Sequence, residues 1–233
     1  MNKSKIQELF DFDKANANNN DFIIGTDEAG RGPGAGPVFA AAICFHKGLD
    51  KEILEKLQIL NDSKQLTEKK REELFENILY LQKQGKCICS IQSGSVEQIE
   101  KINILNTSLD CMKRACEEIQ NSLKSEPNIT LVDGNRLIKN FSAQQKTVVK
   151  GDAKSAAIAA ASILAKVSRD KFMDKLAEEF PQYNWQKNKG YLSSEHITAI
   201  KEYGPTKWHR KKFLRNILQN ETRKNEEAQL TLF

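Results

Sequence analysis

Two adjacent carboxylates, Asp27 and Glu28, stand between a short apolar run and a loop that holds Arg31 and four glycines. Glycine-rich loops expose backbone N–H groups, which together with a guanidinium can bind phosphates or sugars, while paired carboxylates can bind metal ions. The segment therefore predicts a metal site next to a phosphate or sugar site. The alternative is a strand that ends in an ordinary glycine-rich turn with solvated acids.

Two more carboxylates, Asp133 and Asp152, each follow a strand-like apolar run. If they converge with Asp27 and Glu28, the mutual repulsion of four acids requires protons or cations to balance it. Oxygen ligands favour Mg²⁺ or Mn²⁺ over zinc, and two such ions can activate a water and stabilise the leaving oxygen of a phosphodiester. The four acids therefore predict metal-dependent phosphodiester hydrolysis.

Each acid also has a structural role open to it. Asp133 precedes a glycine and could form a turn, and Asp152 could cap the helix that follows it. Neighbouring residues of a regular strand point to opposite faces, so Asp27 and Glu28 share one site only if the backbone bends after Asp27. We expect the glycine loop to supply that bend. A fifth acid, Asp170, lies inside a helical pattern and is expected on the helix surface.

Composition indicates one catalytic body. The chain has 233 residues, 39% of them hydrophobic, which is enough for the core of a single domain. Its net charge of +5 suits a polyanionic partner. Five cysteines without Cys-x-x-Cys spacing argue against disulfides and a zinc site, and no apolar run reaches the ~20 residues that span a bilayer. We therefore expect a soluble, cytoplasmic protein that does not bind a membrane.

Strand and helix patterns alternate along the chain, which favours an α/β body with helices packed on a mixed sheet. We expect strands over residues 22–27, 37–45, 86–92, 128–133 and 147–151, and helices over 67–83, 95–124 and 155–180. The expected organisation is a polar extension (1–20), a catalytic domain (21–185), a helical substrate-binding element (186–217) and a flexible tail (218–233).

Five motifs, in their order along the chain, carry a family resemblance. They are Asp-Glu-Ala-Gly-Arg-Gly at 27–32, Asn-Asp-Ser-Lys at 61–64, Val-Asp-Gly-Asn at 132–135, Lys-Gly-Asp at 150–152 and Ala-Ala-Ser-Ile-Leu-Ala-Lys at 160–166. From about residue 22 to 213 the chain closely resembles the ribonuclease HII family, which cuts the RNA strand of RNA/DNA hybrids and incises duplex DNA on the 5′ side of embedded ribonucleotides.

The resemblance implies a ribonuclease H-like fold, a mixed β-sheet flanked by helices with a C-terminal helical element. It implies that Asp27, Glu28, Asp133 and Asp152 hold two Mg²⁺ or Mn²⁺ ions and catalyse hydrolysis to 3′-hydroxyl and 5′-phosphate ends. A monomer is expected.

Substrate contacts are implied in the same way. The backbone of Gly30, Arg31 and Gly32 is expected to contact the ribose 2′-hydroxyl, because only glycine lets a backbone approach a sugar so closely. Tyr191 matches the family tyrosine that packs on that sugar and senses the junction with DNA. The family usually continues with Gly-Thr or Pro-Thr, whereas this chain has Leu-Ser-Ser at 192–194, a departure that concerns the conformation of this loop.

Further contacts are expected with the phosphates. Ser63 and Lys64 match a motif expected near them, and Lys207, Arg210 and Lys211 belong to a basic, aromatic stretch that resembles the family's C-terminal basic element. Such a surface positions a duplex without reading its sequence, and the alternative is a solvated helix face. Two histidines, His196 and His209, are expected to have structural or phosphate-binding roles rather than to bind metal.

The chain ends in an apolar segment after a polar tether. Gln229, Leu230, Leu232 and Phe233 resemble the Gln-Leu-x-Leu-Phe motif by which bacterial replication proteins bind the sliding clamp. The alternative is that these side chains fold back onto the protein's own surface.

Two rival functions remain open. One is a ribonuclease HIII-like hybrid nuclease, which normally carries a substantial N-terminal domain that the ~20 residues before the first strand cannot form. The other is a non-catalytic nucleotide or nucleic-acid binding module, although no Gly-Lys-Ser/Thr follows the glycines as a P-loop requires.

Overall fold

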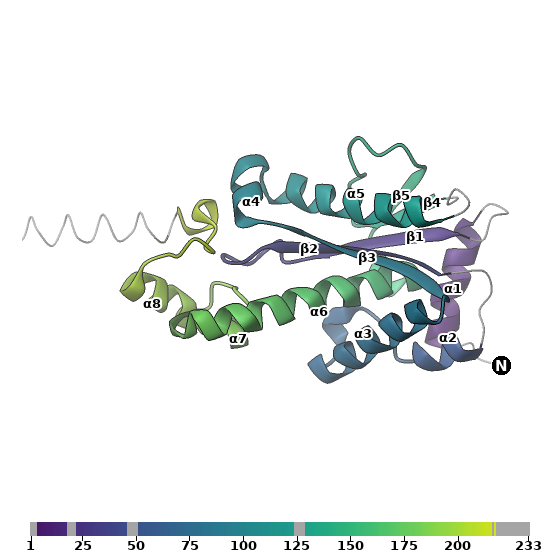
Figure 1. Ribbon diagram of the computed structural model, residues 1–233, viewed down its shortest axis with the longest axis horizontal. Coiled ribbons are helices and arrows are strands. Elements are labelled where there is room, and N and C mark those ends of the chain that lie inside the picture. Colours follow the sequence, from purple (N-terminus) through teal and green to yellow (C-terminus); the bar gives the residue numbers. More distant parts are fainter. Residues whose placement is uncertain (1–3, 18–21, 46–50, 124–128, 216, 218–233) are drawn as a thin grey trace, which may run out of the picture.

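The protein is built around a five-stranded mixed sheet held between two helical layers (Figure 1). The structure, a computed structural model, describes residues 4–17, 22–45, 51–123, 129–215 and 217. The strand order is β3-β2-β1-β4-β5; β1 to β3 are antiparallel, and β4 and β5 add in parallel. The strands are β1 (Ile23–Ala29), β2 (Val38–Phe45), β3 (Cys87–Gly94), β4 (Ile129–Asp133) and β5 (Gln145–Val148). The predicted α/β class with a mixed sheet is confirmed.

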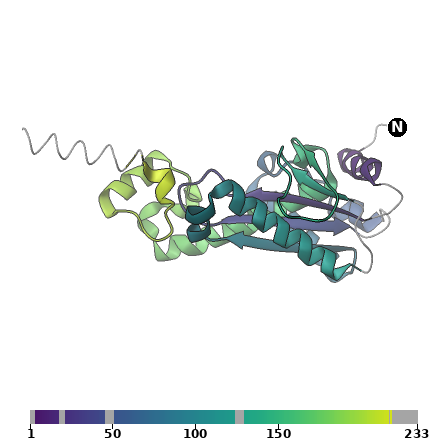
Figure 2. The same ribbon diagram turned by 90° about the horizontal axis from the view of Figure 1, so that it is seen from above.

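Long helices cover the two faces of the sheet. Helix α5 (Ile104–Ser122) lies on one face, and α6 (Ala156–Glu179) lies on the other with α3 (Glu68–Lys83) beside it (Figures 1 and 2). A Cβ atom on Gly25 of β1 would stand only 2.4 Å from the Ala157 carbonyl carbon. The alanine-rich start of α6 therefore lies almost directly on the strand, because small residues on both sides permit the approach.

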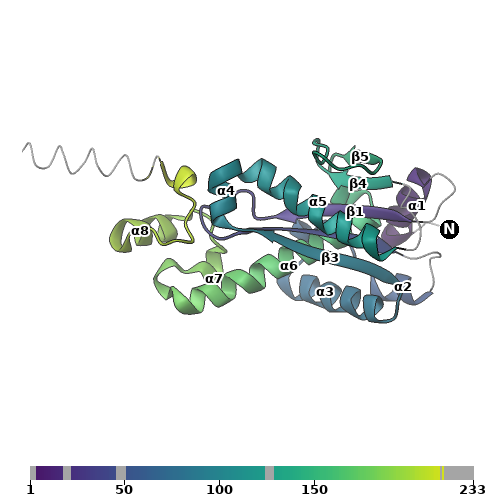
Figure 3. The same cartoon turned by 45° about the horizontal axis from the view of Figure 1, so that its top comes forward.

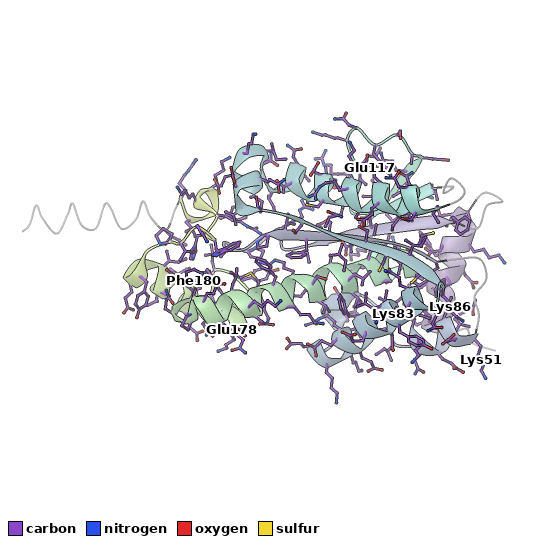
Figure 4. The ribbon with its side chains drawn as sticks, viewed as in Figure 1. Lys51, Lys83, Lys86, Glu117, Glu178 and Phe180 are labelled. Carbon is purple, nitrogen blue, oxygen red and sulfur yellow. The ribbon has the colours of Figure 1, made fainter. Side chains whose placement is uncertain are left out.

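A C-terminal element stands at the far end of α6. It contains η3 (Pro181–Tyr183), α7 (Trp185–Asn188) and α8 (Ser194–Tyr203). The loop that joins β1 to β2 reaches toward it (Figure 3). Figure 4 shows Glu178 and Phe180 at this end of α6, and Lys83 and Lys86 at the opposite end of the molecule. The remaining elements are α1 (Lys5–Asn16), α2 (Lys51–Lys56), η1 (Ser63–Gln65), α4 (Val96–Ile102) and η2 (Gly151–Ala153).

Two predicted element boundaries are wrong. The helix expected over 95–124 is two helices, because Asn103 adopts φ 68° between α4 and α5, and its side chain accepts a hydrogen bond from the Asn106 N–H at 3.0 Å. The last strand ends at Val148, and η2 begins at Gly151 after a turn over residues 149–150. Both changes arise at residues in the left-handed region, the second at Lys150 with φ 55°.

Residues before the first strand also carry structure. Helix α1 buries Ile6, Leu9 and Phe10 in the core that α6 shares, and the Asp13 carboxylate accepts a hydrogen bond from the Ala157 N–H at 2.9 Å. Asp13 therefore caps the start of α6 from outside the helix. Within the described residues, no helix has both the length and the apolar character that a membrane crossing needs.

Candidate active site

The strand register brings the predicted acids together. Strands β1 and β4 pair in parallel with Thr26 opposite Val132, so Asp27 and Asp133 occupy the next, neighbouring positions. The Gly151 N–H donates to Asp133 Oδ1 at 2.7 Å, which holds Asp152, the next residue, close to Asp133. Three separate segments thus meet at one point of the sheet.

The bend expected after Asp27 is absent, because β1 continues regularly to Ala29 and pairs there with β2. Asp27 and Glu28 nevertheless both interact electrostatically with Asp133. The pairing of β1 with β4 stops at Thr26 and Val132, and β4 itself ends one residue later at Asp133, next to Asp27. Convergence therefore comes from where a neighbouring strand ends.

Burial and repulsion make three acids of the cluster, Asp27, Glu28 and Asp152, hard to ionise. Burial raises the pKa of Asp27 well above its usual range, and the charges of Glu28 and Asp133 raise it further. Burial also raises the pKa of Glu28, although Arg31 opposes this, and it raises the pKa of Asp152 together with nearby acids. Such a cluster binds cations because they relieve the repulsion.

Two cationic side chains currently offset these charges. Arg31 lies 3.2 Å from Glu28, and Lys64 Nζ lies 3.6 Å from Asp152 Oδ2. Burial opposes protonation of Lys64, but the attraction of Asp152 and other acids outweighs it and raises the pKa of the ammonium. Among the described residues, no three acidic, histidine or cysteine side chains are placed to hold one metal ion together. Metal binding therefore requires these carboxylates to turn toward the ion, and their oxygen-only donor set fits Mg²⁺ or Mn²⁺.

The last two residues of the Asn-Asp-Ser-Lys segment differ in exposure. Ser63 is buried, and its hydroxyl is hydrogen-bonded to Ser162 Oγ of α6 at 2.7 Å. The Ser63 hydroxyl thus anchors η1 to α6, and a contact of Ser63 with substrate stays a prediction. Lys64 is exposed beside the acids, where it can reach a phosphate.

Gly32 of the glycine loop lies beside the Tyr191 ring, and we call the surface that this pair forms the slot. Tyr191 is 51% exposed, and a Cβ on Gly32 would meet its ring edge at 3.4 Å and no other neighbour within 4 Å. The Gly34 N–H donates to the Gly190 carbonyl at 2.9 Å, which ties the two segments together. In the residues that depart from the family pattern, the Leu192 side chain packs against Gly34. The departure thus adds an apolar contact to this loop.

The basic C-terminal stretch contains both surface and interior residues. Lys207 and Lys211 are exposed and can face a polyanion. Arg210 is fully buried, so the expectation that it contacts substrate is wrong. Asp170 also differs from its expectation: it is 7% exposed and paired with Lys166 at 2.8 Å, because α6 is covered by other elements along that side.

Two buried histidines, His196 and His209, form a hydrogen-bond network that reaches the main chain of Tyr191. Trp185 Nε1 donates to His196 Nε2 at 2.9 Å, so His196 carries its proton on Nδ1 and donates it to the Tyr191 carbonyl at 2.9 Å. His209 Nδ1 accepts from the Thr206 N–H at 2.9 Å, so its Nε2 donates to His196 Nε2 at 3.1 Å. Both rings are neutral in this network, and the expected structural role is supported.

Protonation of His209 in acid is expected to break this hydrogen-bond network. Burial lowers the pKa of His209 to about 4, from an ordinary value near 6.5. Between these values the unfolded chain binds more protons at this position than the folded one, so the contribution of His209 to stability falls as the pH falls from about 6.5 to about 4. Thermal unfolding monitored by Trp185 fluorescence, in a Trp208→Phe background, measures this slope. His209→Gln is expected to flatten it, and an unchanged slope contradicts the assignment.

Comparison with known proteins points to one family. The family model described as Ribonuclease HII matches residues 24–219. Ribonuclease HII of Fusobacterium nucleatum is 48% identical over 206 residues, which are 88% of this chain and 91% of the relative. Ribonuclease HII of Pelagibacter ubique is 48% identical over 193 residues, 82% of this chain and 95% of the relative.

Solved structures agree with the architecture. The structure of the PCNA:RNase HII complex from Archaeoglobus fulgidus matches with a TM-score of 0.62 at 28% identity, covering 81% of this chain and 93% of the solved one. Bst-RNase HIII in complex with Mn²⁺ matches with a TM-score of 0.65, 87% of this chain and 70% of the solved one; at 16% identity it shows the fold alone. With four acids gathered at the sheet and relatives of nearly equal length, the chain belongs to the ribonuclease HII family, endoribonucleases that degrade the RNA of RNA/DNA hybrids.

Proposed function

We propose that the protein also incises duplex DNA on the 5′ side of a single embedded ribonucleotide, by two-metal hydrolysis that leaves 3′-hydroxyl and 5′-phosphate ends. One observation carries the proposal. The glycine loop leaves β1 after Ala29, one residue beyond Glu28, so the slot formed by Gly32 and Tyr191 is close to the acids along the chain. A sugar held in the slot places its neighbouring phosphate at the cluster.

Asp27, Glu28, Asp133 and Asp152 would hold the metal ions. When bound, Mg²⁺ or Mn²⁺ supplies Lewis acidity and lowers the pKa of water at the scissile phosphate. The protein's residues perform the rest. The Gly32 backbone and the Tyr191 ring bind the ribose and orient it, because a 2′-hydroxyl distinguishes RNA from DNA.

Exposed cations around the site position the phosphates. Arg31 and Lys64 now pair with cluster acids, and metal ions that take over those acids would leave both side chains available to substrate phosphates. Lys207 and Lys211 lie exposed on the C-terminal element and bind the duplex backbone farther along. These contacts fix register and carry no sequence information.

Three duplexes test the function: an RNA/DNA hybrid, a DNA duplex with one ribonucleotide, and the same duplex in all-DNA form. We expect cleavage of the first two with Mg²⁺ or Mn²⁺, a cut on the 5′ side of the ribonucleotide, and none after chelation. Product ends are read by gel mobility and by ligation. Equal cleavage of the all-DNA duplex, or an uncut single-ribonucleotide duplex, contradicts the proposal.

Tethering to the bacterial sliding clamp is a separate proposal. Gln229, Leu230, Leu232 and Phe233 lie outside the described residues, so the support comes from the motif and from the Archaeoglobus relative, which was solved in complex with PCNA. Deleting residues 229–233 is expected to abolish binding to immobilised clamp and to leave cleavage of free duplex unchanged. Retained clamp binding would refute the tether. A monomer, measured by light scattering, and a cytoplasmic location remain predictions.

A further inference from the structure

Arg210 lies completely inside the protein and is surrounded by the glycine loop. Within the part of the chain that the structure describes, its guanidinium donates to main-chain carbonyls alone. The acceptors are Gly36 at 2.9 Å, Arg31 at 3.2 Å, Pro33 at 2.8 Å and Gly30 at 2.7 Å. One side chain therefore engages most of the loop's length, from a position more than 170 residues away in sequence.

Arg169 of α6 approaches the same loop from another side. It is 1% exposed and donates to the carbonyls of Pro37 at 3.2 Å and Ala35 at 3.1 Å. Its third contact, to the Lys189 carbonyl at 2.9 Å, reaches the segment that leads into Tyr191. Arg169 thus links the glycine loop to the tyrosine segment.

Neither arginine forms an ion pair with any residue that the structure describes. Burial lowers the pKa of Arg169 to about 10 and that of Arg210 to about 9, which reflects the cost of holding charge away from water. Buried charges are ordinarily paired with acids. Here the compensation comes from carbonyls of an irregular loop, which lack the partners that a sheet would provide.

The glycines of the loop leave room for these arginines. A Cβ on Gly30 would stand 2.2 Å from Arg169 Nε, whereas a Cβ on Gly32 would meet only the Tyr191 ring. The two glycines therefore do different things: Gly30 admits the arginine, and Gly32 faces the slot. Hydrogen bonds from two buried arginines therefore hold the loop conformation in the protein without substrate.

We propose that Arg169 and Arg210 are positioning residues that hold the glycine loop and the Tyr191 segment as one preformed ribose-recognition unit. Ribonucleotide selectivity then depends on two guanidinium groups that never touch the substrate. This inference rests on the proposed function of the slot. A preformed unit helps because a displacement of about 1 Å at a reacting centre can cost about 100-fold in rate.

Arginine-to-lysine variants test the proposal. Lysine keeps the charge but lacks the planar fork, so Arg210→Lys cannot serve four carbonyls at once. We expect kcat for the single-ribonucleotide duplex to fall about 10- to 100-fold, with a smaller fall for a continuous hybrid that offers several riboses. Hydrogen exchange is expected to rise only over residues 30–37 and 189–191. Arg169→Lys is expected to show the same changes in kcat and hydrogen exchange. It replaces Arg210→Lys in the test if that variant folds poorly.

Two further variants separate positioning from binding and from stability. Lys211→Ala is expected to raise KM and to reduce the salt dependence of binding, with kcat unchanged, since it removes a phosphate contact. Arg114→Lys is the matched control, because Arg114 also donates to a main-chain carbonyl, that of Ser93 at 2.9 Å, but on helix α5. It is expected to keep wild-type kcat and selectivity.

The outcomes are distinguishable. A wild-type protein that fails to incise the single-ribonucleotide duplex overturns the proposed function and, with it, this inference. If the wild type incises, wild-type kcat and exchange in both arginine variants overturn the positioning role alone. Equal losses on both substrates, in proportion to a lowered melting temperature, also overturn it, since they indicate only a loss of stability.

Discussion

Asp133→Asn is expected to reduce cleavage at least about 1,000-fold while leaving the fold intact, because removing a metal-binding charge forfeits roughly 4 kcal/mol of transition-state stabilisation. Asp133 is the acid that interacts with each of the other three. Its Oδ1 accepts the Gly151 N–H, and an asparagine oxygen can accept the same bond. The variant therefore removes charge and keeps geometry.

Single-turnover cleavage of the single-ribonucleotide duplex at saturating enzyme and fixed metal concentration measures this loss. Without metal, the melting temperature is expected to stay level or to rise, since one of several mutually repelling carboxylates is gone. Asp110→Asn is the control; Asp110 lies on α5, where its partner is Arg114 at 3.0 Å. Substantial activity in Asp133→Asn would mean that the cluster does not perform the chemistry.

Gly32→Ala is expected to lower kcat/KM on the single-ribonucleotide duplex about 10- to 100-fold without lowering stability. The added methyl group projects toward the Tyr191 ring at 3.4 Å, an ordinary contact distance, so the folded protein tolerates it. The same methyl group occupies the slot where the ribose is proposed to lie, and a misfit of this size in a binding site costs about 1–3 kcal/mol. Activity is expected to fall without a loss of stability, because the added methyl group meets the proposed position of the substrate and no tightly packed protein atom.

Gly30→Ala is the informative comparison, two residues away in the same motif. Gly30 has φ 100°, and its Cβ would collide with the Arg169 side chain. We expect a lower melting temperature, reflecting a strain of about 1–3 kcal/mol, together with lower activity. Thermal unfolding and cleavage assays of both variants decide the matter. Wild-type kcat/KM in Gly32→Ala would show that the ribose does not enter this slot.

Much of the secondary structure could be predicted from the sequence, and with it the acids proposed for the site. Asp27, Asp133 and Asp152 follow apolar runs with strand character, and such runs depend on local periodicity. Their convergence was only a condition of the prediction, and the β1–β4 register together with the hydrogen bond from the Gly151 N–H to Asp133 meets it, since β1 continues past Asp27 and Asp152 lies in η2. The alanine-rich pattern of 155–180 likewise predicted the helix α6. Local conformations such as that of Asn103, with φ 68°, escaped this reasoning because they interrupt an otherwise continuous pattern.

Which polar residues face solvent could not be predicted from the sequence. Arg210 stood in a basic stretch typical of a surface, and Ser63 in a motif expected near phosphate, yet both are buried. Arg169 lies in a helix of small residues, and no sequence pattern predicts a role for it. Its guanidinium nevertheless donates hydrogen bonds to two carbonyls of the loop. Whether a charged side chain is exposed depends on the segments packed over it. For these residues the covering segments and the carbonyl acceptors come from far along the chain, so no local pattern contains them.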